Sequence, residues 1–467
     1  MNKIIASAAF LLCFCCANGL FAQESALLDQ EFKTATIKQL GVLLEAHYVF
    51  PDVAKKTAAH LQEQLEAGAF DKANDLQAFA IALTESVQSV NHDKHMRIRP
   101  MPAGTGRSDK PGVAIQEKLD RMAAQRMNAA GFREVKRLDG NIGYLDLRGF
   151  APLNTGVPMA DRYMGLLAGT DAIIIDLRKN GGGNPAMVQY LCSYFFDEHI
   201  HLNSLYWREG DHTEEFWTLD KVGGEKMPDV PLFILTSSFT FSGAEEFSYN
   251  MQTRKRATLV GETTGGGANP GGMIPINEKL GVFIPTGTAI NPVTGKNWEG
   301  TGVEPEIKTT ADEAFDMAVE LASTAARAYR QKIREGYEVQ LTGLFAMLAA
   351  YPDDAEEEKI FESMQQCTSN GCLMENNIND MGYEFLIMHQ KPETAEVIFK
   401  CNARLFPESA NVYDSYGEAL LANGKAAEAV DNYRKAVELA ETNGGSNLEV
   451  FKANLAAAEK AASSKRP

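Results

Sequence analysis

Apolar residues recur with helical spacing over the first part of the chain, from Ala26 to about Val90. The segments ATIKQLGVLLEAHYVF and DLQAFAIALTESVQSV each place a hydrophobic face on a helix. Pro51 interrupts the pattern between them, because proline lacks a backbone donor and ends or kinks a helix. The pattern predicts a small helical domain of at least two helices, which we place at residues 23–100.

Short apolar runs replace the helical spacing from about Asn141 to Ile307. The runs NIGYLDL, AIIIDLR, PLFILTS, ATLVG and GVFIPTG predict strands, and MVQYLCSYFF and AEEFSYNMQ predict helices between them. Strands that alternate with helices and glycine-rich turns favour an α/β domain with a substantially parallel sheet. We assign residues 101–328 to this domain.

The third region, from about Ala311 onward, has no convincing strand and is rich in Ala, Glu, Leu and Lys. Two of its segments superimpose at an offset of 34 residues, which aligns Asp380 with Asp414, Leu386 with Leu420, Ala395 with Ala429 and Phe399 with Tyr433. This offset is the tetratricopeptide period. We therefore expect a helical linker at 329–375 and an all-α, tetratricopeptide-like region at 376–467, with a generic pair of helical hairpins as the alternative.

The first residues have the pattern of a targeting segment. Lys3 precedes an apolar run from Ile4 to about Phe21, and small residues near Ala22 offer a cleavage point before Gln23. The pattern predicts a signal peptide at 1–22 and an exported protein, periplasmic or secreted. A membrane anchor is the alternative, although Asn18 and Gly19 break the run. A lipidated cysteine is disfavoured, because no suitable small residue precedes Cys13, Cys15 or Cys16.

Composition narrows the function classes. The 467 residues are 45% apolar and 23% charged, which is ordinary for a soluble protein with a large core. The formal net charge of −17 gives no electrostatic reason to expect nucleic-acid binding or an anionic membrane surface. No later stretch is long enough for an integral membrane segment. After the signal, Cys192, Cys367, Cys372 and Cys401 remain, and Cys367 and Cys372 form either a small disulfide loop or free thiols.

Ser242 is the first candidate catalytic residue. In LTSSFTFSGAEEF it lies just beyond a predicted buried strand, at the start of a helix. Its oxygen is then near the positive end of the helix and the free amide of Gly243, which favours developing negative charge. The alternative is purely structural, because Ser242-Gly-Ala-Glu245 also fits a capping box.

Two glycine-rich turns suggest cofactors only superficially. Gly181-Gly182-Gly183-Asn-Pro-Ala186 formally fits a dinucleotide fingerprint, but Asp176, Arg178 and Asn180 separate the glycines from the strand. A turn whose backbone amides bind an oxyanion is the better interpretation. The run GETTGGGANPGG lacks the Lys-Ser/Thr of a phosphate-binding loop. We expect no cofactor.

Histidine supplies few candidate bases. His92 and His95 lie in SVNHDKHMRI, where a helix gives way to an alternating, strand-like pattern. His92 with His95, and His199 with His201, are spaced like partial zinc sites, but neither pair has cysteine or further histidine ligands close by in the sequence. We expect no metal site, and a lone surface histidine is the ordinary alternative for each.

From about Gln30 to Leu321 the chain resembles the tail-specific, or C-terminal processing, serine peptidase superfamily. It is most similar to the branch related to interphotoreceptor retinoid-binding protein and to the tricorn protease core. The matching segments, in the order of that family, are HDKHMRIRP, GNIGYLDLRGF, IIIDLRKNGGG, LTSSFTFSGAEEFSYNMQ, LVGETTGGGANPGG and NPVTGKNWEGTGVEPEI. The resemblance implies a crotonase-like ββα core.

The same resemblance implies roles for individual residues. Ser242 of TFSGAEEF becomes the nucleophile, His95 of Asp-Lys-His the general base, and Glu299 of WEGTGVEPEI the acid that orients the histidine. The implied oxyanion donors are the amides of Gly243 and of one residue of the triple glycine, for which we choose Gly182 over Gly181. Glu262 in GETTGGG is a competing carboxylate for the role of Glu299.

Two departures from the family matter. Relatives with a serine and lysine dyad carry the lysine 25 residues beyond the serine, and this chain has Gly267 there. A lysine mechanism is therefore disfavoured, although Lys94 lies beside His95 as a second candidate for the base. The segment between His95 and Ile142 is too short for the PDZ module that many relatives insert at this point, so recognition of free C-terminal tails through such a module is unsupported.

The sequence thus predicts an exported serine-type endopeptidase that hydrolyses a peptide or protein substrate by a Ser-His-Glu acyl-enzyme mechanism. One alternative is a non-catalytic module on the same fold that binds an apolar ligand or a protein partner. A second is an adaptor whose C-terminal helical repeats recruit a protein partner while the peptidase-like core serves as a scaffold.

Overall fold

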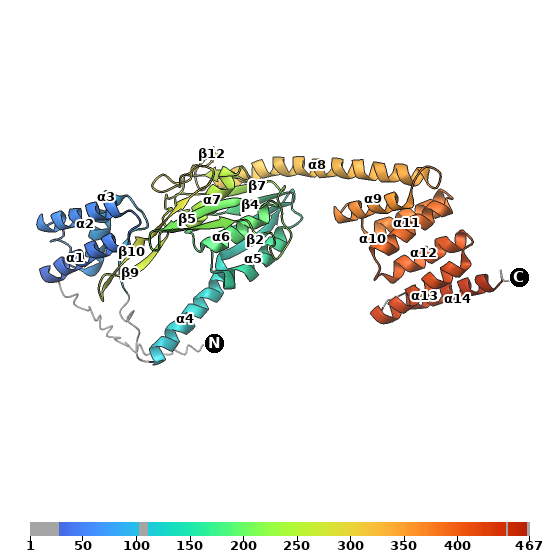
Figure 1. The fold of residues 1–467 in the computed structure, drawn as a ribbon, viewed down its shortest axis with the longest axis horizontal. Helices are drawn as coiled ribbons and strands as arrows, with labels where there is room; N and C mark the ends of the chain where they lie inside the picture. The colour runs from blue at the N-terminus through green and yellow to red at the C-terminus, as the bar shows by residue number, and fades with distance from the viewer. Residues whose placement is uncertain (1–27, 102–110, 445–446, 465–467) are drawn as a thin grey trace, which may run out of the picture. The chain divides into compact units, whose positions relative to one another are not determined.

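A computed structural model describes residues 28–101, 111–444 and 447–464. The chain divides into two compact units, Met1–Arg327 and Ala328–Pro467 (Figure 1). The predicted signal peptide lies outside the described residues.

Three helices form the N-terminal part of the first unit: α1 (Gln30–His47), α2 (Pro51–Glu66) and α3 (Leu76–Asn91). Asp29 and Asp75 cap α1 and α3, because their carboxylates accept hydrogen bonds from amides in the first turn. Pro51 begins α2, a position where its missing N–H costs nothing.

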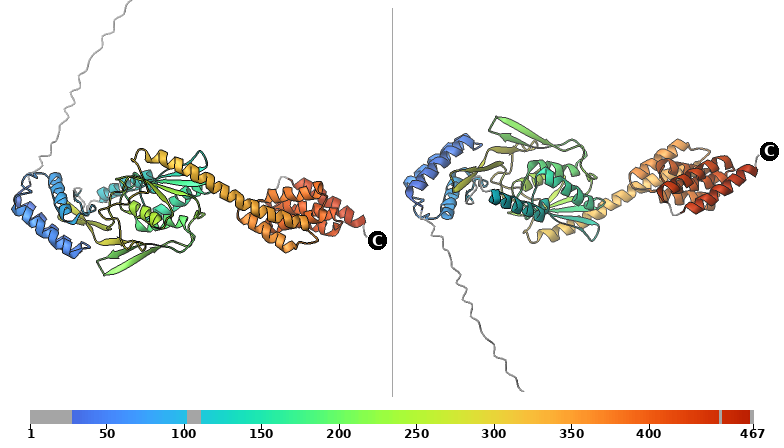
Figure 2. Two further views of the ribbon diagram at one scale, coloured as in Figure 1. Left: turned by 90° about the horizontal axis from the view of Figure 1, so that it is seen from above. Right: turned by 90° about the horizontal axis from the view of Figure 1, so that it is seen from below.

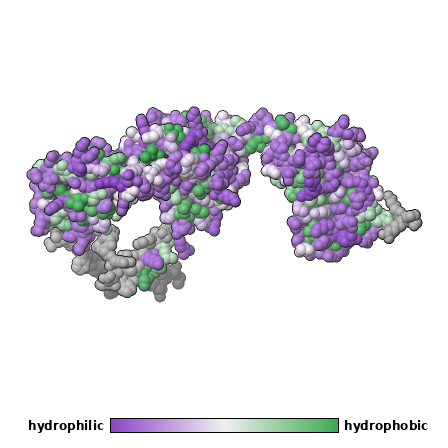
Figure 3. Space-filling view, viewed as in Figure 1, coloured by the Kyte–Doolittle hydropathy of each residue, from purple (hydrophilic) through white to green (hydrophobic). Residues whose placement is uncertain are grey.

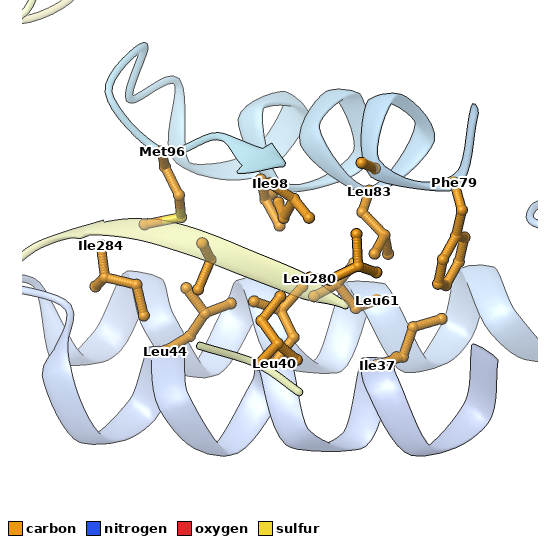
Figure 4. Close-up of a cluster of buried hydrophobic side chains, with 14 of the residues drawn as sticks. Ile37, Leu40, Leu44, Leu61, Phe79, Leu83, Met96, Ile98, Leu280 and Ile284 are labelled. Carbon is orange, nitrogen blue, oxygen red and sulfur yellow. The ribbon is translucent and has the colours of Figure 1, made fainter. Parts of the chain in front are cut away.

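A small antiparallel sheet joins these helices to the rest of the unit. It consists of β1 (Ile98–Pro100), β10 (Leu280–Pro285) and β9 (Gly271–Pro275), in that order. Figure 4 shows Leu280 and Ile284 of β10 packed among helical residues such as Leu40 and Leu83. The N-terminal helices and β10 therefore share one hydrophobic core, which joins the segment between α3 and β1 to the small sheet.

The main sheet has six strands in the order β12 (Ile307–Lys308), β8 (Thr258–Gly261), β7 (Leu232–Thr236), β4 (Ala172–Asp176), β3 (Ile142–Leu147) and β2 (Phe132–Leu138). Neighbouring strands are parallel except for β2 and β3. Strands β3, β4 and β7 are buried along their whole length. Such continuous burial explains why the sequence shows apolar runs here rather than alternation.

Helices pack over the main sheet (Figures 1 and 2). Alanines at the start of α8 (Ala314–Ala350) pack against residues of β3, β4, β7 and β8. Helices α5 (Leu153–Leu167) and α7 (Gly243–Thr253) contact β3 and β8, and α6 (Pro185–Cys192) packs between α5 and α7. Helix α4 (Pro111–Asn128) precedes β2.

A second antiparallel sheet, in the order β11 (Gly287–Ile290), β5 (His201–Trp207) and β6 (His212–Trp217), completes the first unit. The predicted strands at NIGYLDL, AIIIDLR, PLFILTS and ATLVG form the parallel part of the main sheet, so the predicted α/β class is confirmed. The run GVFIPTG instead forms β10 of the small antiparallel sheet.

The described residues of the second unit include the later part of α8 and the α-helices α9 (Glu357–Ser369), α10 (Glu375–Tyr383), α11 (Pro392–Leu405), α12 (Ala410–Ala422), α13 (Ala426–Asn443) and α14 (Leu448–Ser464). Leu344, Ile360 and Met364 share a core with Ile378 and Phe399. Residues 329–375, expected as a linker, are therefore part of this core rather than a separate segment.

Cys367 and Cys372 are free thiols, so the small loop is held without a disulfide. Burial raises the pKa of Cys367 to about 11, and the neighbouring Cys372 adds to the shift. Hydrophilic residues predominate on the face of the molecule in Figure 3. Among residues 28–101, 111–444 and 447–464, no helix is both long enough and apolar enough to cross a membrane.

Candidate active site

Ser242 lies immediately before α7, in the turn that follows β7. Its backbone has φ 55° and ψ −123°, a strained conformation for a residue with a side chain, which costs on the order of 1–3 kcal/mol. The Ser242 amide donates to Glu245 Oε2 at 2.8 Å, while Ser242 Oγ makes no hydrogen bond that caps the helix. Ser242 and Glu245 thus form the predicted capping-box pair, and Ser242 Oγ lies at the N-terminus of α7.

A cavity of about 600 Å³ opens beside this serine, and its lining includes Ser242, Gly243 and His95. Gly243 N is the first amide of α7 and belongs to the group of N-terminal amides that a helix leaves without a partner. The cavity therefore brings together the predicted nucleophile, the predicted base and one predicted oxyanion donor. We call it the serine-side cavity.

Gly182 does not fit the donor role that the sequence suggested. Its amide donates to Asn180 Oδ1 at 2.8 Å. A Cβ on Gly182 would lie 2.7 Å from Gly243 N, and φ is 101°, so close packing against the nucleophile turn explains why glycine is needed here. Gly181 and Gly183 border the serine-side cavity instead, which makes their amides the better candidates for the second donor.

His95 lies between α3 and β1, with its ring between two phenylalanines. The ring centroids of Phe241 and Phe283 are 4.5 and 5.6 Å from that of His95. Burial, with a contribution from the charge of Arg97, lowers the pKa of His95 to about 4. The imidazole is therefore neutral at pH 7, as a general base must be before it accepts a proton.

Glu299 lies beside His95, in the turn between β11 and β12. Its Oε2 accepts hydrogen bonds from the amides of Ala268 at 2.6 Å and Asn269 at 3.2 Å. Its Oε1 is buried without a hydrogen-bond partner, and so is His95 Nδ1. One ligand atom from each of Glu299, His95 and Asp93 lies within 4.8 Å of the others. The two unpaired atoms are the acceptor and donor that an orienting acid and its histidine require.

Asp93 is a site residue that the sequence analysis did not single out. It is fully buried and accepts hydrogen bonds from His95 N at 3.0 Å and Asn269 Nδ2 at 2.9 Å. Asp93 therefore holds the histidine segment against the loop that carries Asn269. Burial and the nearby charge of Asp93 raise the pKa of Glu299 to about 8. The pattern Asp-Lys-His was the available signal, since a carboxylate two residues before a base can accept from its amide.

Glu245 anchors the other side of the site. Its buried carboxylate accepts from Thr264 Oγ1 at 2.5 Å, Gly266 N at 2.6 Å and Gly267 N at 2.8 Å, in addition to Ser242 N. One side chain thus ties the nucleophile turn to the glycine-rich loop. The sequence showed Glu245 only as a helix cap, because its partners in the loop are distant along the chain.

The structure also explains the glycine found where relatives have lysine. A Cβ on Gly267 would lie 2.2 Å from Phe241 Cζ and 2.7 Å from His95 Cε1. The imidazole and the phenyl ring therefore occupy the space that a side chain at this position would need. Lys94 Nζ donates to Gly265 O at 2.6 Å, and Lys94 is not among the residues that line the serine-side cavity.

The remaining candidates lie elsewhere or are already bonded. Glu262 accepts from Ser238 N at 3.1 Å and Ala311 N at 3.2 Å, and these hydrogen bonds lower its pKa. His199 and His201 stack on Trp217.

Asp93, His95 and Glu299 have the donor types of a cation site. However, their existing hydrogen bonds leave mainly Glu299 Oε1 and His95 Nδ1, fewer than the three protein ligands of a typical zinc enzyme.

A helix-flanked parallel sheet with a serine at the strained start of a helix is typical of hydrolases that use a serine nucleophile. The chain is similar to peptidase family S41. The model of peptidase family S41 matches residues 141–309, and the model of the N-terminal domain of peptidase S41 in eukaryotic IRBP matches residues 25–132. The predicted resemblance is thereby confirmed at the level of the family.

Individual relatives are distant. A carboxy-terminal-processing protease of Bartonella bacilliformis is 24% identical over 175 residues, which cover 37% of this chain and 39% of the relative. A lipoprotein from Streptococcus agalactiae is 14% identical, with a TM-score of 0.42 over 62% of this chain and 96% of that one. The tricorn protease is also 14% identical, with a TM-score of 0.41 over 64% of this chain and 37% of that one.

Proposed function

We propose that this protein is a serine endopeptidase that hydrolyses peptide bonds through an acyl-enzyme on Ser242. The observation that carries the proposal is the geometry of three residues. A serine with a strained backbone shares a cavity with a neutral, buried histidine. His95 Nδ1 and Glu299 Oε1 are both buried without a hydrogen-bond partner, and one ligand atom of each residue lies within 4.8 Å of the other.

His95 accepts the proton of Ser242 Oγ as the oxygen attacks the substrate carbonyl. Glu299 accepts a hydrogen bond from His95 Nδ1, which fixes the tautomer and stabilises the imidazolium. His95 then donates its proton to the leaving amine. A water molecule releases the acyl group by the same route, and Ser242 is regenerated.

The negative charge of the tetrahedral intermediate falls on the former carbonyl oxygen. Gly243 N, at the positive end of α7, is one donor to this oxygen, and the amide of Gly181 or Gly183 is the second. Removal of one oxyanion donor costs about 2.7–4 kcal/mol of transition-state stabilisation in subtilisin, a serine protease of a different fold.

The targeting pattern of residues 1–22 supports export to a periplasmic or extracellular location, where peptide and protein substrates are available. The helical repeats of the second unit are a further surface for a protein partner, since stacked helix pairs generate extended binding faces.

Hydrolysis of a fluorogenic peptide library by the wild-type protein and by Ser242→Ala tests the proposal. We expect cleavage by the wild type and none by the variant, with a melting temperature close to that of the wild type. Equal cleavage by both proteins would refute the assignment of the nucleophile. A folded wild type that cleaves nothing and binds an apolar ligand would instead support the non-catalytic alternative.

A further inference from the structure

Two cavities meet at His95. The serine-side cavity contains Ser242 and Gly243. A second cavity of about 510 Å³ shares His95, Phe241 and Phe283 with it but does not include the serine. We call the second one the arginine-side cavity, because Lys94, Arg97 and Arg99 are among its lining residues. The two cavities form the two sides of the predicted reaction centre.

The serine-side cavity contains a buried acid that the mechanism does not use. Glu246 follows Ser242 by one helical turn on α7 and is 5% exposed. Within the part of the chain that the structure describes, Glu246 forms no ion pair. Burial raises the pKa of its carboxyl to about 8, an effect that the nearby Asn203 amide only partly opposes.

A buried carboxyl without a cation destabilises the fold, so its presence calls for a functional reason. The side chain faces a cavity whose walls are largely apolar, with Leu205, Phe216 and Ala289 among them. A second acid, Glu214 on β6, lines the same cavity from an exposed position. Apolar walls suit the methylene stem of a long side chain, and the acids suit a positive charge at its end.

The arginine-side cavity has the opposite charge. Among the described residues, its lining contains the basic side chains of Lys94, Arg97 and Arg99 and no acidic one. Arg97 Nε donates to Lys94 O at 3.0 Å, while Arg99 projects from the exposed side of β1. An acidic side chain or a carboxylate terminus is the chemistry that this cavity would attract.

The roles of Ser242 and His95 set the direction of the peptide. The acyl part of the substrate must lie beside the nucleophile and the oxyanion donors, and the leaving amine must lie beside the histidine that protonates it. The serine-side cavity therefore receives the residue before the cleaved bond. The arginine-side cavity receives residues after it.

We propose that Glu246 makes the enzyme cleave after a lysine or arginine, and that the basic side chains of the arginine-side cavity favour an acidic residue after the cleaved bond. This inference rests on the proposed function of Ser242. It adds to that function the class of sequence that is cut and the residues that select it.

Four fluorogenic peptides of equal length test the proposal, with Lys-Glu, Glu-Lys, norleucine-Glu and Lys-norleucine at the cleaved bond. We expect kcat/KM for Lys-Glu to exceed that for Glu-Lys by at least about 100-fold, and that for norleucine-Glu and for Lys-norleucine by about 10-fold each. The ratio of Lys-Glu to norleucine-Glu should fall by about 10-fold in Glu246→Gln. The matched variant Glu214→Gln, altered at the exposed acid, should change this ratio less.

Arg99→Gln should lower the ratio of Lys-Glu to Lys-norleucine and leave the ratio of Lys-Glu to norleucine-Glu as it is. Such ratios do not depend on the amount of folded enzyme. Labelling of Ser242 by a fluorophosphonate is measured in parallel. It distinguishes a failure of this inference alone from a failure of the proposed peptidase function. Labelling without a preference for lysine, or with a preference that survives in Glu246→Gln, overturns this inference and leaves the proposed function intact. Loss of both labelling and cleavage in the wild type overturns both.

Discussion

The two compact units place their charged groups differently. In the second unit, ion pairs such as Arg404–Glu358 and Arg434–Asp431 lie at the surface, over cores made mainly of aliphatic and aromatic residues. In the first unit, Asp93, Glu245 and Glu246 are buried at or beside the candidate active site, and burial raises the pKa of each. Stability alone explains the second arrangement. The buried carboxyl groups of the first unit cost stability, and such groups cluster at functional sites.

The largest expected effect comes from the base. His95→Ala should lower kcat by roughly 10⁴-fold or more, because the serine loses its proton acceptor. Lys94→Ala is the comparison variant, and it should lower kcat far less, since Lys94 Nζ bonds to a backbone carbonyl. Steady-state kinetics of the two purified variants distinguish the residues. An inactive Lys94→Ala beside an active His95→Ala would transfer the role of base to the lysine.

The next effect concerns the two competing glutamates. Glu299→Gln should lower kcat by roughly 10²–10⁴-fold, since the amide cannot stabilise the imidazolium. It should leave the melting temperature nearly unchanged. Glu262→Gln weakens two hydrogen bonds to loop amides and should lower the melting temperature slightly, with turnover retained. Turnover and thermal unfolding are measured on both variants. They distinguish a carboxylate that acts in catalysis from one that stabilises the fold. A folded but inactive Glu262→Gln would reverse the assignment.

A smaller effect is expected in the dependence of kcat/KM on pH. Burial raises the pKa of Glu299 to about 8, so the carboxyl is mostly neutral below that pH and ionised above it. Because the ionised form is the acceptor for His95, kcat/KM should rise with pH through about 8. The pKa of His95, lowered to about 4, places protonation of the base well below its usual range near 6.5.

The variant Asp93→Asn removes a charge that raises the pKa of Glu299, so the rise in kcat/KM should move to lower pH. In Glu299→Gln this rise should disappear. A rise centred near pH 6.5 that persists in Glu299→Gln would show that an ordinary histidine, rather than the glutamate, controls the profile.

The smallest effect is expected from removing the second unit. A chain that ends at Arg327 keeps the whole sheet and the alanines of α8 that pack on it. It should cleave a short, unstructured peptide within about 3-fold of the full-length rate, because the helices of the second unit bury their apolar residues in cores of their own. Peptide hydrolysis by the truncated and full-length proteins gives the comparison. Loss of both folding and activity would show that the helices complete the catalytic unit.

Local patterns predicted much of this fold. The apolar runs at β3, β4 and β7 are continuous because these strands are buried on both faces, and the helical spacing of the first region matches α1 and α3. The antiparallel pairing of β10 with β1 and β9 was not predicted, since strand partners distant in sequence leave no local pattern.

The candidate site likewise combines a residue that the local sequence predicts with residues that only the fold brings together. Ser242 follows from a local strand-to-helix pattern, whereas His95 and Glu299 came from a family resemblance and are brought together only by the fold. The choice of Gly182 as oxyanion donor does not fit the structure, because its amide is bonded to Asn180, a partner that sequence spacing does not reveal. The contacts of Asp93 and Glu245 are likewise tertiary.

The central claim is that Ser242 is an activated nucleophile. Treatment of the wild-type protein with a fluorophosphonate, followed by mass spectrometry of its peptides, tests this claim most directly. We expect one modified peptide that contains Ser242, no modification in Ser242→Ala, and strongly reduced modification in His95→Ala. Modification of a different residue, or equal modification of the wild type and Ser242→Ala, would contradict it.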